Sequence, residues 1–386
     1  MIDTFKLEAL VNWLIAGAPP KAAFTETVAE LVRGMVGCGL PVDALTLHTK
    51  NFNPTLFGTR VSWTPERGIQ MSRYSHEQMA TVVWIGSAPY HAIEAGRVMV
   101  GRFGTGAPHD AHYSSQRMKE RGYTAYVICP LFSKFTPTGA VSVYTKRPEG
   151  FTAEAETAIR RLQAPLARVA EAEALHSNTV SLLSTYVGRN AGDKVMDGRI
   201  LRGHSETITA VILFADLSNF TALSNTLTTD RTIGLLNAYF EALDSAIRAN
   251  GGETLKFIGD GLLAIFPTQD EIAEQTAAAM GAISALDDAR AALARAGGEG
   301  PDIAFRAALH IGEVSYGNIG SANRLDFTAV GPSVNLTARM LQASTELDAR
   351  TVCSDAFAPL TRGRAKPARA FAFKGFAEAV MVHVVG

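Results

Sequence analysis

Long apolar runs alternate with helical patterns in the second half of the chain. The run ITAVILFAD at 208–216 is apolar enough for a buried strand, and 232–252 spaces its apolar residues by helical turns before two glycines. The later patterns are, in order, a hairpin at 253–266, a helix at 271–298, strands at 304–314 and 324–330, and a helix from Pro332. This order predicts an α+β domain over residues 199–386.

Shorter patterns of both kinds fill residues 1–151. A helix pattern at 27–40 stops at glycines, and a helix is also expected near 91–96. Strand patterns occur at 44–50, 55–63, 124–132 and 139–146. Strands interleaved with helices and ending in a hairpin predict a sheet with helices packed on it. This order, with the segments ERGYTAYVICPLFS and GAVSVYTKRPEGFT, resembles a GAF-type sensor domain, and the resemblance names no ligand.

A different pattern connects these two regions, over residues 152–198. Apolar residues recur there in alternating steps of three and four, as in the seam of a coiled coil: Ile159, Leu162, Leu166, Val169, Val180, Leu183 and Val187. Pro165 lies inside the pattern and is expected to kink or interrupt the helix. The first half could pack on the sensor sheet, whereas the second half could pair with a second copy of the chain.

Composition excludes several classes of protein. The 386 residues include 36 basic and 37 acidic side chains, and a net charge of −1 argues against a nucleic-acid-binding surface. The three cysteines are widely spaced, so neither a disulfide framework nor a zinc site is expected. We see no signal peptide and no apolar stretch long enough to span a membrane, and we therefore expect a cytoplasmic protein.

Two aspartates are placed where strands end. Asp216 closes the first apolar run, and Asp260 occupies the tip of the hairpin ETLKFIGDGLLAIF. Carboxylates at the ends of adjacent strands can converge on magnesium, with substrate phosphates completing the coordination shell. The helix expected after Asp216 would offer free amides to phosphate. Alternatively, Asp216 caps that helix and Asp260 is a turn residue.

Three further side chains could contact a nucleotide. Lys256 lies in an apolar strand, where a lysine needs either a partner or a route to the surface, and it could donate to a purine nitrogen. Asn335 and Arg339 are spaced i to i+4 on the last predicted helix and therefore share one face. An amide beside a guanidinium suits a ribose and a phosphate, although such a pair could also be a solvated helix face.

Taken together, FADLSNFT, LKFIGDGLLAIF and GPSVNLTARM resemble the catalytic domain of class III nucleotidyl cyclases over residues 205–386. The resemblance implies a ferredoxin-like palm in which helices cover a sheet. It also implies two Mg²⁺ or Mn²⁺ ions per active site, held by Asp216, Asp260 and the backbone carbonyl of Leu217. The ribose 3′ oxygen of the substrate would attack the α-phosphorus, and pyrophosphate would leave.

The same resemblance assigns the remaining residues. Lys256 and Thr328 match the base-reading pair, and a lysine donor with a threonine acceptor favours ATP over GTP. Asn335 would orient the ribose and Arg339 would stabilise the charge at the α-phosphate. The residues matched to phosphate contacts are Phe220 and Thr221, through their amides, and Arg324 and Lys374, through their side chains. Many family members carry aspartate at the position of Thr328, and threonine resembles a subgroup that responds to bicarbonate.

The resemblance also implies how the chain assembles. The metal residues and the base and ribose residues come from opposite partners in this family, so we expect a head-to-tail homodimer with its active sites at the interface. A small-molecule or protein signal at the N-terminal domain would regulate cyclic AMP production. The alternatives are a cyclase for GTP or a pyrimidine nucleotide, and a non-catalytic nucleotide-binding regulator.

Overall fold

The chain folds into two compact units, Met1–Leu182 and Leu183–Gly386. Their structure, a computed structural model, describes residues 1–18, 23–50, 53–54, 56–79, 84–107, 110–132, 137–296 and 303–386. Within these ranges no helix is long and apolar enough to cross a membrane. Cys38, Cys129 and Cys353 are each buried with a free thiol.

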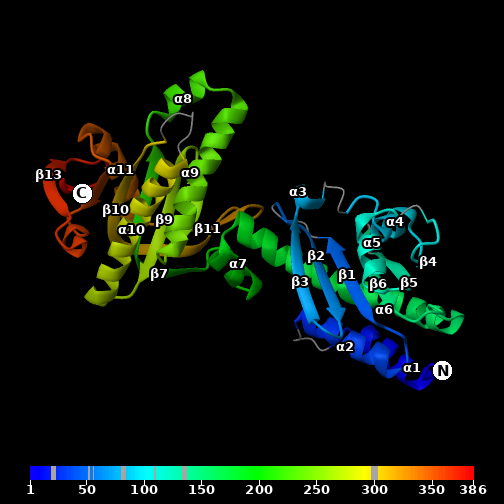
Figure 1. The fold of residues 1–386 in the computed structure, drawn as a ribbon. Coiled ribbons are helices and arrows are strands. Elements are labelled where there is room, and N and C mark those ends of the chain that lie inside the picture. Colours follow the sequence, from blue (N-terminus) through cyan, green and yellow to red (C-terminus); the bar gives the residue numbers. More distant parts are fainter. Residues whose placement is uncertain are drawn as a thin grey trace. The chain divides into compact units, whose positions relative to one another are not determined.

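The N-terminal unit is built on a six-stranded antiparallel sheet in the order β3-β2-β1-β6-β5-β4 (Figure 1). Its strands are β1 (Ala44–Lys50), β2 (Leu56–Thr64), β3 (Gly68–Ser75), β4 (Met99–Arg102), β5 (Ala125–Phe132) and β6 (Pro137–Thr145). Its helices are α1 (Thr4–Ile15), α2 (Phe24–Gly37), α3 (His76–Met79), α4 (Ala88–Ala95), α5 (Tyr113–Glu120) and the first part of α6 (Ala153–Tyr186).

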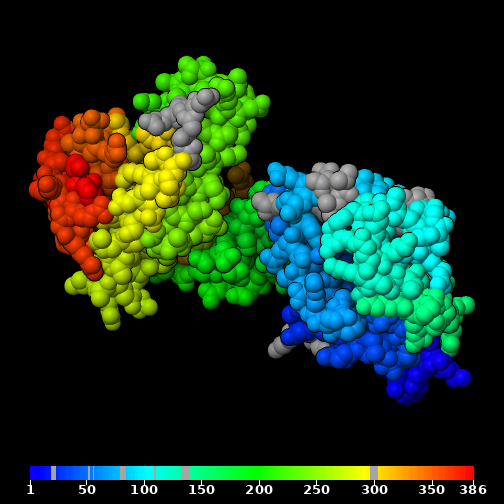
Figure 2. Space-filling view, in the orientation of Figure 1, coloured from blue at the N-terminus to red at the C-terminus, as the bar shows by residue number. Residues whose placement is uncertain are grey.

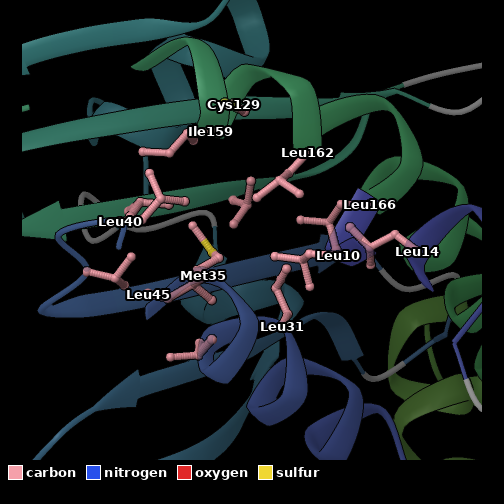
Figure 3. Packing of buried hydrophobic residues seen from close by; sticks show 14 of the residues in the cluster. Leu10, Leu14, Leu31, Met35, Leu40, Leu45, Cys129, Ile159, Leu162 and Leu166 are labelled. Atoms are coloured by element: carbon pink, nitrogen blue, oxygen red, sulfur yellow. The ribbon is translucent and has the colours of Figure 1, made fainter. Parts of the chain in front are cut away.

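Alternation along β1 divides this sheet into two faces. Leu45 and Leu47 point into the main core, where side chains of α1, α2 and α6 pack against the strands (Figure 3). Thr46 and His48 therefore point to the opposite face. On that face a smaller cluster, which includes Tyr126 and Tyr144, lies over β5 and β6 beside α4.

The strands β1 and β6 approach each other closely at Gly139. A Cβ atom at this position would lie 1.7 Å from the backbone carbonyl oxygen of His48. Because the obstacle is backbone and not a flexible side chain, only glycine fits between the strands there.

Helix α6 runs through Pro165 without interruption, so of the two expected effects of this proline the interruption does not occur. Leu162 and Leu166, on either side of the proline, are buried in the N-terminal core and hold both parts of the helix against it. Proline removes the amide that would bond to the carbonyl of Arg161, and this residue is exposed to water that can bond to it instead. The first half of the seam therefore packs on the N-terminal unit, as proposed for it from the sequence.

Acid is expected to destabilise the N-terminal unit through His48. Burial, aided by the charge of Arg60, lowers the pKa of His48 from 6.5 to about 3. The unfolded chain therefore binds the proton first, and stability is lost as the pH falls below 6.5. From pH 7 to pH 5 the free energy of unfolding should fall by about 2 kcal/mol.

All three tryptophans of the chain, Trp13, Trp63 and Trp84, lie in this unit, so tryptophan fluorescence in urea measures its unfolding alone. The variant His48→Gln should show a smaller fall over the same pH range. An equal fall in the variant and the wild type would contradict the prediction.

The C-terminal unit contains an eight-stranded sheet whose order is β13-β14-β12-β10-β7-β9-β8, with β11 paired to β10. Its strands are β7 (Ser205–Leu217), β8 (Glu253–Ile258), β9 (Gly261–Thr268), β10 (Phe305–Gly320), β11 (Leu325–Val330), β12 (Thr351–Ser354), β13 (Ala365–Phe371) and β14 (Val380–Val385). Its helices are α7 (Arg189–Met196), α8 (Phe220–Thr226), α9 (Thr229–Ala249), α10 (Ile272–Ala296), α11 (Pro332–Glu346) and the short 3₁₀ helix η1 (Ala358–Thr361).

The long strand β7 lies near the middle of this sheet and contributes to both of its faces. Val211, Leu213 and Ala215 pack with α9 and α10, which lie along one face (Figure 1). Ala210 and Ile212 point to the other face, where they pack with residues of β9, β10 and β11. This second face bears the candidate site.

The structure matches most of the predicted elements and extends several of them. The mixed helix and strand class is confirmed, and α11 begins at Pro332 as predicted. Strands β7 and β10 are longer than their apolar runs because their outer residues pair with each other, Ser205 with Gly317. Helix α9 buries Leu235, Tyr239, Leu243, Ala246 and Ile247, whereas Ile233 is exposed.

Candidate active site

The two predicted metal aspartates lie side by side at one end of the central strands. Asp216 is the penultimate residue of β7 and is paired in register with Gly261, the first residue of β9. Asp260 precedes Gly261 in the two-residue turn between β8 and β9, where Gly259 has a φ of +64°. Glycine takes this conformation without strain, and the tight turn fixes Asp260 beside the end of β7.

The negative charges of Asp216 and Asp260 favour a cation between them. Burial, together with the charge and hydrogen bonding of Asp260, raises the pKa of Asp216 to about 6. Burial and the charges of the same two carboxylates also raise the pKa of Tyr239 in α9. Two adjacent carboxylates repel each other unless a positive charge lies between them. A divalent ion would supply that charge.

The donor set fits magnesium or manganese. Among the described residues no group of three or more His, Cys, Asp or Glu side chains converges, and the aspartate pair offers two carboxylates. Magnesium commonly takes one or two carboxylates and fills its shell with water and substrate phosphates. The backbone carbonyl of Leu217, directly after Asp216 at the end of β7, is the third predicted ligand.

Helix α8 begins immediately after this strand. Asn219 precedes it in a left-handed conformation, and the first intrahelical bonds run from the amides of Ala222 and Leu223 to the carbonyl of Asn219. The amides of Phe220 and Thr221, the two predicted phosphate contacts, therefore have no acceptor inside the helix.

The predicted base-reading residues lie around β8 and β11. Lys256 is paired with Leu263 of β9, so its side chain leaves the sheet on the same face as Asp216. Its Nζ lies 3.4 Å from Oδ2 of Asp326 in β11. Thr328, two residues farther along β11, is buried, and its hydroxyl has no hydrogen-bond partner among the described residues.

Asp326 is a site residue that the sequence reading missed. It precedes Thr328 by two positions in a strand, so both side chains point to the same side of β11. That spacing, together with the need of Lys256 for a partner, could have identified it from the sequence.

Asn335 and Arg339 both lie on α11, where their i to i+4 spacing puts them on one face, as predicted. The helix buries Val334, Leu336 and Met340 against the unit, whereas Asn335 is exposed and Arg339 is half-buried. In the described part of the chain, no hydrogen bond or ion pair connects either of them to Asp216 or Asp260. One copy of the chain thus presents two separate groups of candidate residues.

The other two predicted phosphate contacts lie at exposed positions. Arg324 belongs to the turn between β10 and β11, where its backbone bonds with Ser321. Lys374 lies in the turn that connects β13 to β14. Among the described residues, no hydrogen bond or ion pair connects either side chain to the aspartate pair.

A second missed group links α7 to the strands of the site. Glu253, at the start of β8, is buried and accepts hydrogen bonds from Tyr316 (2.8 Å) and Asn190 of α7 (3.0 Å). The ring of Tyr316 packs edge-on against Phe327 of β11, with 4.8 Å between centroids. Glu253 thus connects α7 to the two strands that carry Lys256 and Thr328.

The variant Tyr316→Phe should destabilise the C-terminal unit. It removes the hydroxyl that donates to a buried carboxylate, and a hydrogen bond to a charged group contributes about 1.5–3 kcal/mol. Urea unfolding followed by circular dichroism should show a loss of that size. Thr345→Val, which also removes one hydroxyl but at an exposed position of α11, is the control and should leave the unfolding free energy unchanged. A Tyr316→Phe chain as stable as the wild type would show that this bond contributes nothing.

Comparison with known proteins identifies this unit. Residues 204–362 match the model of the family described as the adenylate and guanylate cyclase catalytic domain. These residues form a class III nucleotide cyclase catalytic domain. Cyclase domains of this class use divalent metal ions, in agreement with the paired aspartates. The GAF-like assignment of the N-terminal unit has no such match and stays a prediction.

The relatives of the cyclase domain match only part of this chain. An uncharacterized protein of Mycobacterium tuberculosis is 28% identical over 173 residues, which are 45% of this chain and 31% of the relative. The terminal-differentiation specific adenylate cyclase of Dictyostelium discoideum is 30% identical over 142 residues, 36% of this chain and 6% of that protein. The solved structure of the adenylyl cyclase CyaB from P. aeruginosa aligns with 47% of this chain and 96% of its own, at 24% identity and a TM-score of 0.40.

Proposed function

We propose that the chain is an adenylate cyclase, which converts ATP to 3′,5′-cyclic AMP and pyrophosphate. The observation that carries this proposal is the pairing of donor and acceptor beside β11. Lys256, held by Asp326, offers an ammonium to the N1 acceptor of adenine, and the unpartnered hydroxyl of Thr328 can accept from its 6-amino group. Guanine presents the opposite pattern on this edge. The adenylate cyclase name of a matched relative agrees with this choice.

The residues of the chain position the substrate for an in-line displacement. Asn335 orients the ribose, so that its 3′ oxygen faces the α-phosphorus. The new bond forms between these atoms as the bond to the bridging oxygen of pyrophosphate breaks, and the hydroxyl proton is released to water. Arg339 stabilises the charge that develops on the α-phosphate. The amides of Phe220 and Thr221 and the side chains of Arg324 and Lys374 contact the phosphates.

Asp216, Asp260 and the carbonyl of Leu217 hold the divalent ions. When bound, these ions neutralise the triphosphate and favour ionisation of the attacking hydroxyl. The paired carboxylates, with the raised pKa of Asp216, are the feature of this chain that supports the assignment.

We further propose that two copies of the chain form the active sites head to tail. Each copy supplies its aspartates to one site and its Lys256, Thr328, Asn335 and Arg339 to the other. The predicted seam residues Val180, Leu183 and Val187 are half-buried, whereas the second half of α6 exposes Leu175, Leu182 and Tyr186, at 61%, 37% and 75% of their surface. These three exposed residues are the ones available to a paired connector. Leu175 and Leu182 are one heptad apart. The N-terminal unit would act as a GAF-like sensor in the cytoplasm.

The first test compares substrates. Purified full-length protein is incubated with ATP, GTP, CTP or UTP, each with magnesium or manganese and with or without bicarbonate, and the products are separated by chromatography. Cyclic AMP formed from ATP in preference to the other cyclic products is the expected result. A preference for GTP or a pyrimidine nucleotide would overturn the assignment of Lys256 and Thr328. No cyclic product from a folded dimer would favour a nucleotide-binding regulator.

The variant Thr328→Val tests the acceptor directly. Valine keeps the shape of threonine but cannot accept from the adenine amino group, so kcat/KM for ATP should fall roughly tenfold, as expected for one hydrogen bond. Thr345→Val, at an exposed position near the end of α11, is the matched control. Equal kcat/KM values for Thr328→Val and the wild type would exclude Thr328 from base recognition.

A further inference from the structure

The N-terminal unit contains a pocket of about 1270 Å³. It lies on the sheet face opposite the main core, since Thr46 and His48 line it whereas Leu45 and Leu47 are buried in that core. Residues of α4 and α5 complete its wall, and these helices (cyan) lie beside the blue strands in Figure 2. Its volume slightly exceeds the common range for small-molecule sites.

The pocket is rich in positive charge. Four arginines line it, and the exposed Glu94 is its only carboxylate among the described residues. These arginines are Arg60, Arg67, Arg117 and Arg121. In the ranges that the structure covers, none of these four arginines forms an ion pair with a carboxylate. The carboxylate of Glu66 is paired with Lys146 instead. Such a concentration of guanidinium groups favours an anion.

Arg60 is the arginine most firmly built into the floor. It is paired in register with His48 across β1 and β2, and its guanidinium carbon lies 5.4 Å from the centroid of the Tyr74 ring. Its Nε is buried and has no hydrogen-bond partner among the described residues. His48 beside it is neutral, since burial lowers its pKa to about 3, and a neutral imidazole does not compensate the charge of Arg60. A buried donor without an acceptor is costly, and a ligand oxygen would remove that cost.

Aromatic rings line the same pocket as Arg60. The ring of Trp84 lies 5.1 Å from that of His48 and 6.4 Å from that of Tyr90, measured between centroids. Phe103 and Tyr144, stacked at 6.2 Å, line another part of the pocket. Rings arranged in this way pack well against a flat ligand.

We propose that this pocket binds a planar organic anion, an aromatic ring system bearing a carboxylate, sulfonate or phosphate, with the acidic group on Arg60 and the rings beside Trp84. The proposal does not depend on the activity of the cyclase domain. It gives the N-terminal unit a chemical class of ligand, which neither the sequence nor its relatives supply.

Two dyes that differ in charge test the proposal on the full-length chain. 1-Anilinonaphthalene-8-sulfonate is a flat aromatic anion, and N-phenyl-1-naphthylamine is its uncharged counterpart. Fluorescence titration excited through tryptophan should show one anionic dye bound per chain, because Trp63 and Trp84 line the pocket. The variant Arg60→Gln should weaken binding of the anionic dye by at least about tenfold and that of the neutral dye by less than about twofold. Arg33→Gln, on the exposed side of α2, should change neither.

A second measurement needs no variant and covers the case in which Arg60→Gln fails to fold. Raising the salt concentration should weaken binding of the anionic dye to the wild-type chain and leave the neutral dye unaffected. Equal affinity for the two dyes, insensitivity of the anionic dye to salt, or unchanged binding in a folded Arg60→Gln chain would each overturn the proposal.

Discussion

Replacing Asp260 by asparagine is expected to lower cyclic nucleotide formation by at least about 10²–10³-fold, the effect of removing one group that acts on transition-state charge. Asparagine has the shape of aspartate, and the turn that holds residue 260 is fixed by Gly259 and by the pairing of β8 with β9. The loss would therefore come from the missing charge and not from a changed backbone.

The stability of this variant should move in the opposite direction from its activity. Asp260 contributes repulsion that raises the pKa of Asp216, and the neutral amide removes it. Thermal unfolding in the absence of metal should therefore show a melting temperature equal to or above that of the wild type. Asp270→Asn, an exposed carboxylate of the same unit, is the control for activity. Retention of substantial activity by Asp260→Asn would remove this residue from the reaction.

The second large effect concerns complementation between two inactive chains. Asp216→Ala lacks the metal group, and Arg339→Ala lacks the group that stabilises the α-phosphate. Each protein alone should be inactive. After equal amounts are mixed and allowed to exchange subunits, half of the dimers contain one copy of each, and one of the two sites in those dimers has every residue. About a quarter of the wild-type activity should return, as head-to-tail symmetry requires.

The choice of the two variants that are mixed shows which copy of the chain supplies each group of site residues. Asp216→Ala mixed with Asp260→Ala should recover nothing, because both changes fall on the same side of every site. Mixtures that never exceed the sum of their parents, with subunit exchange verified, would show that one chain builds a whole site. The comparison therefore tests the dimer separately from the identity of the nucleotide.

Local sequence signals predicted the parts of the site that tight backbone geometry determines. Gly-Asp-Gly between apolar runs predicted the turn that holds Asp260, and Pro332 predicted the start of the helix on which Asn335 and Arg339 share one face. The closeness of Asp216 and Asp260 depends on the register of three strands, which the family resemblance implied and the pairing of Asp216 with Gly261 now describes. Arg324 and Lys374 rested on short matches, and their roles stay predictions.

Contacts between distant segments were not predictable from local patterns. Glu253 and Tyr316 are 63 positions apart, and nothing in either neighbourhood indicates that a buried carboxylate would accept from a tyrosine. The continuity of α6 through Pro165 has a similar cause, because the local cost of proline is outweighed by packing on a core formed by residues far away in the sequence. The arginine pocket likewise appears only when β1, β2 and β3 lie side by side.

The close approach at Gly139 limits how this protein can diversify. Gly139 lines the pocket, and any larger residue there would collide with the backbone of His48. Substitutions at this position should be selected against whichever ligand the pocket binds. Related chains whose pockets bind different compounds should therefore differ in the side chains around the pocket, such as those at positions 74, 84 and 117, and keep glycine at position 139. A survey of natural variants should therefore show varied residues at positions 74, 84 and 117 and nearly invariant glycine at position 139.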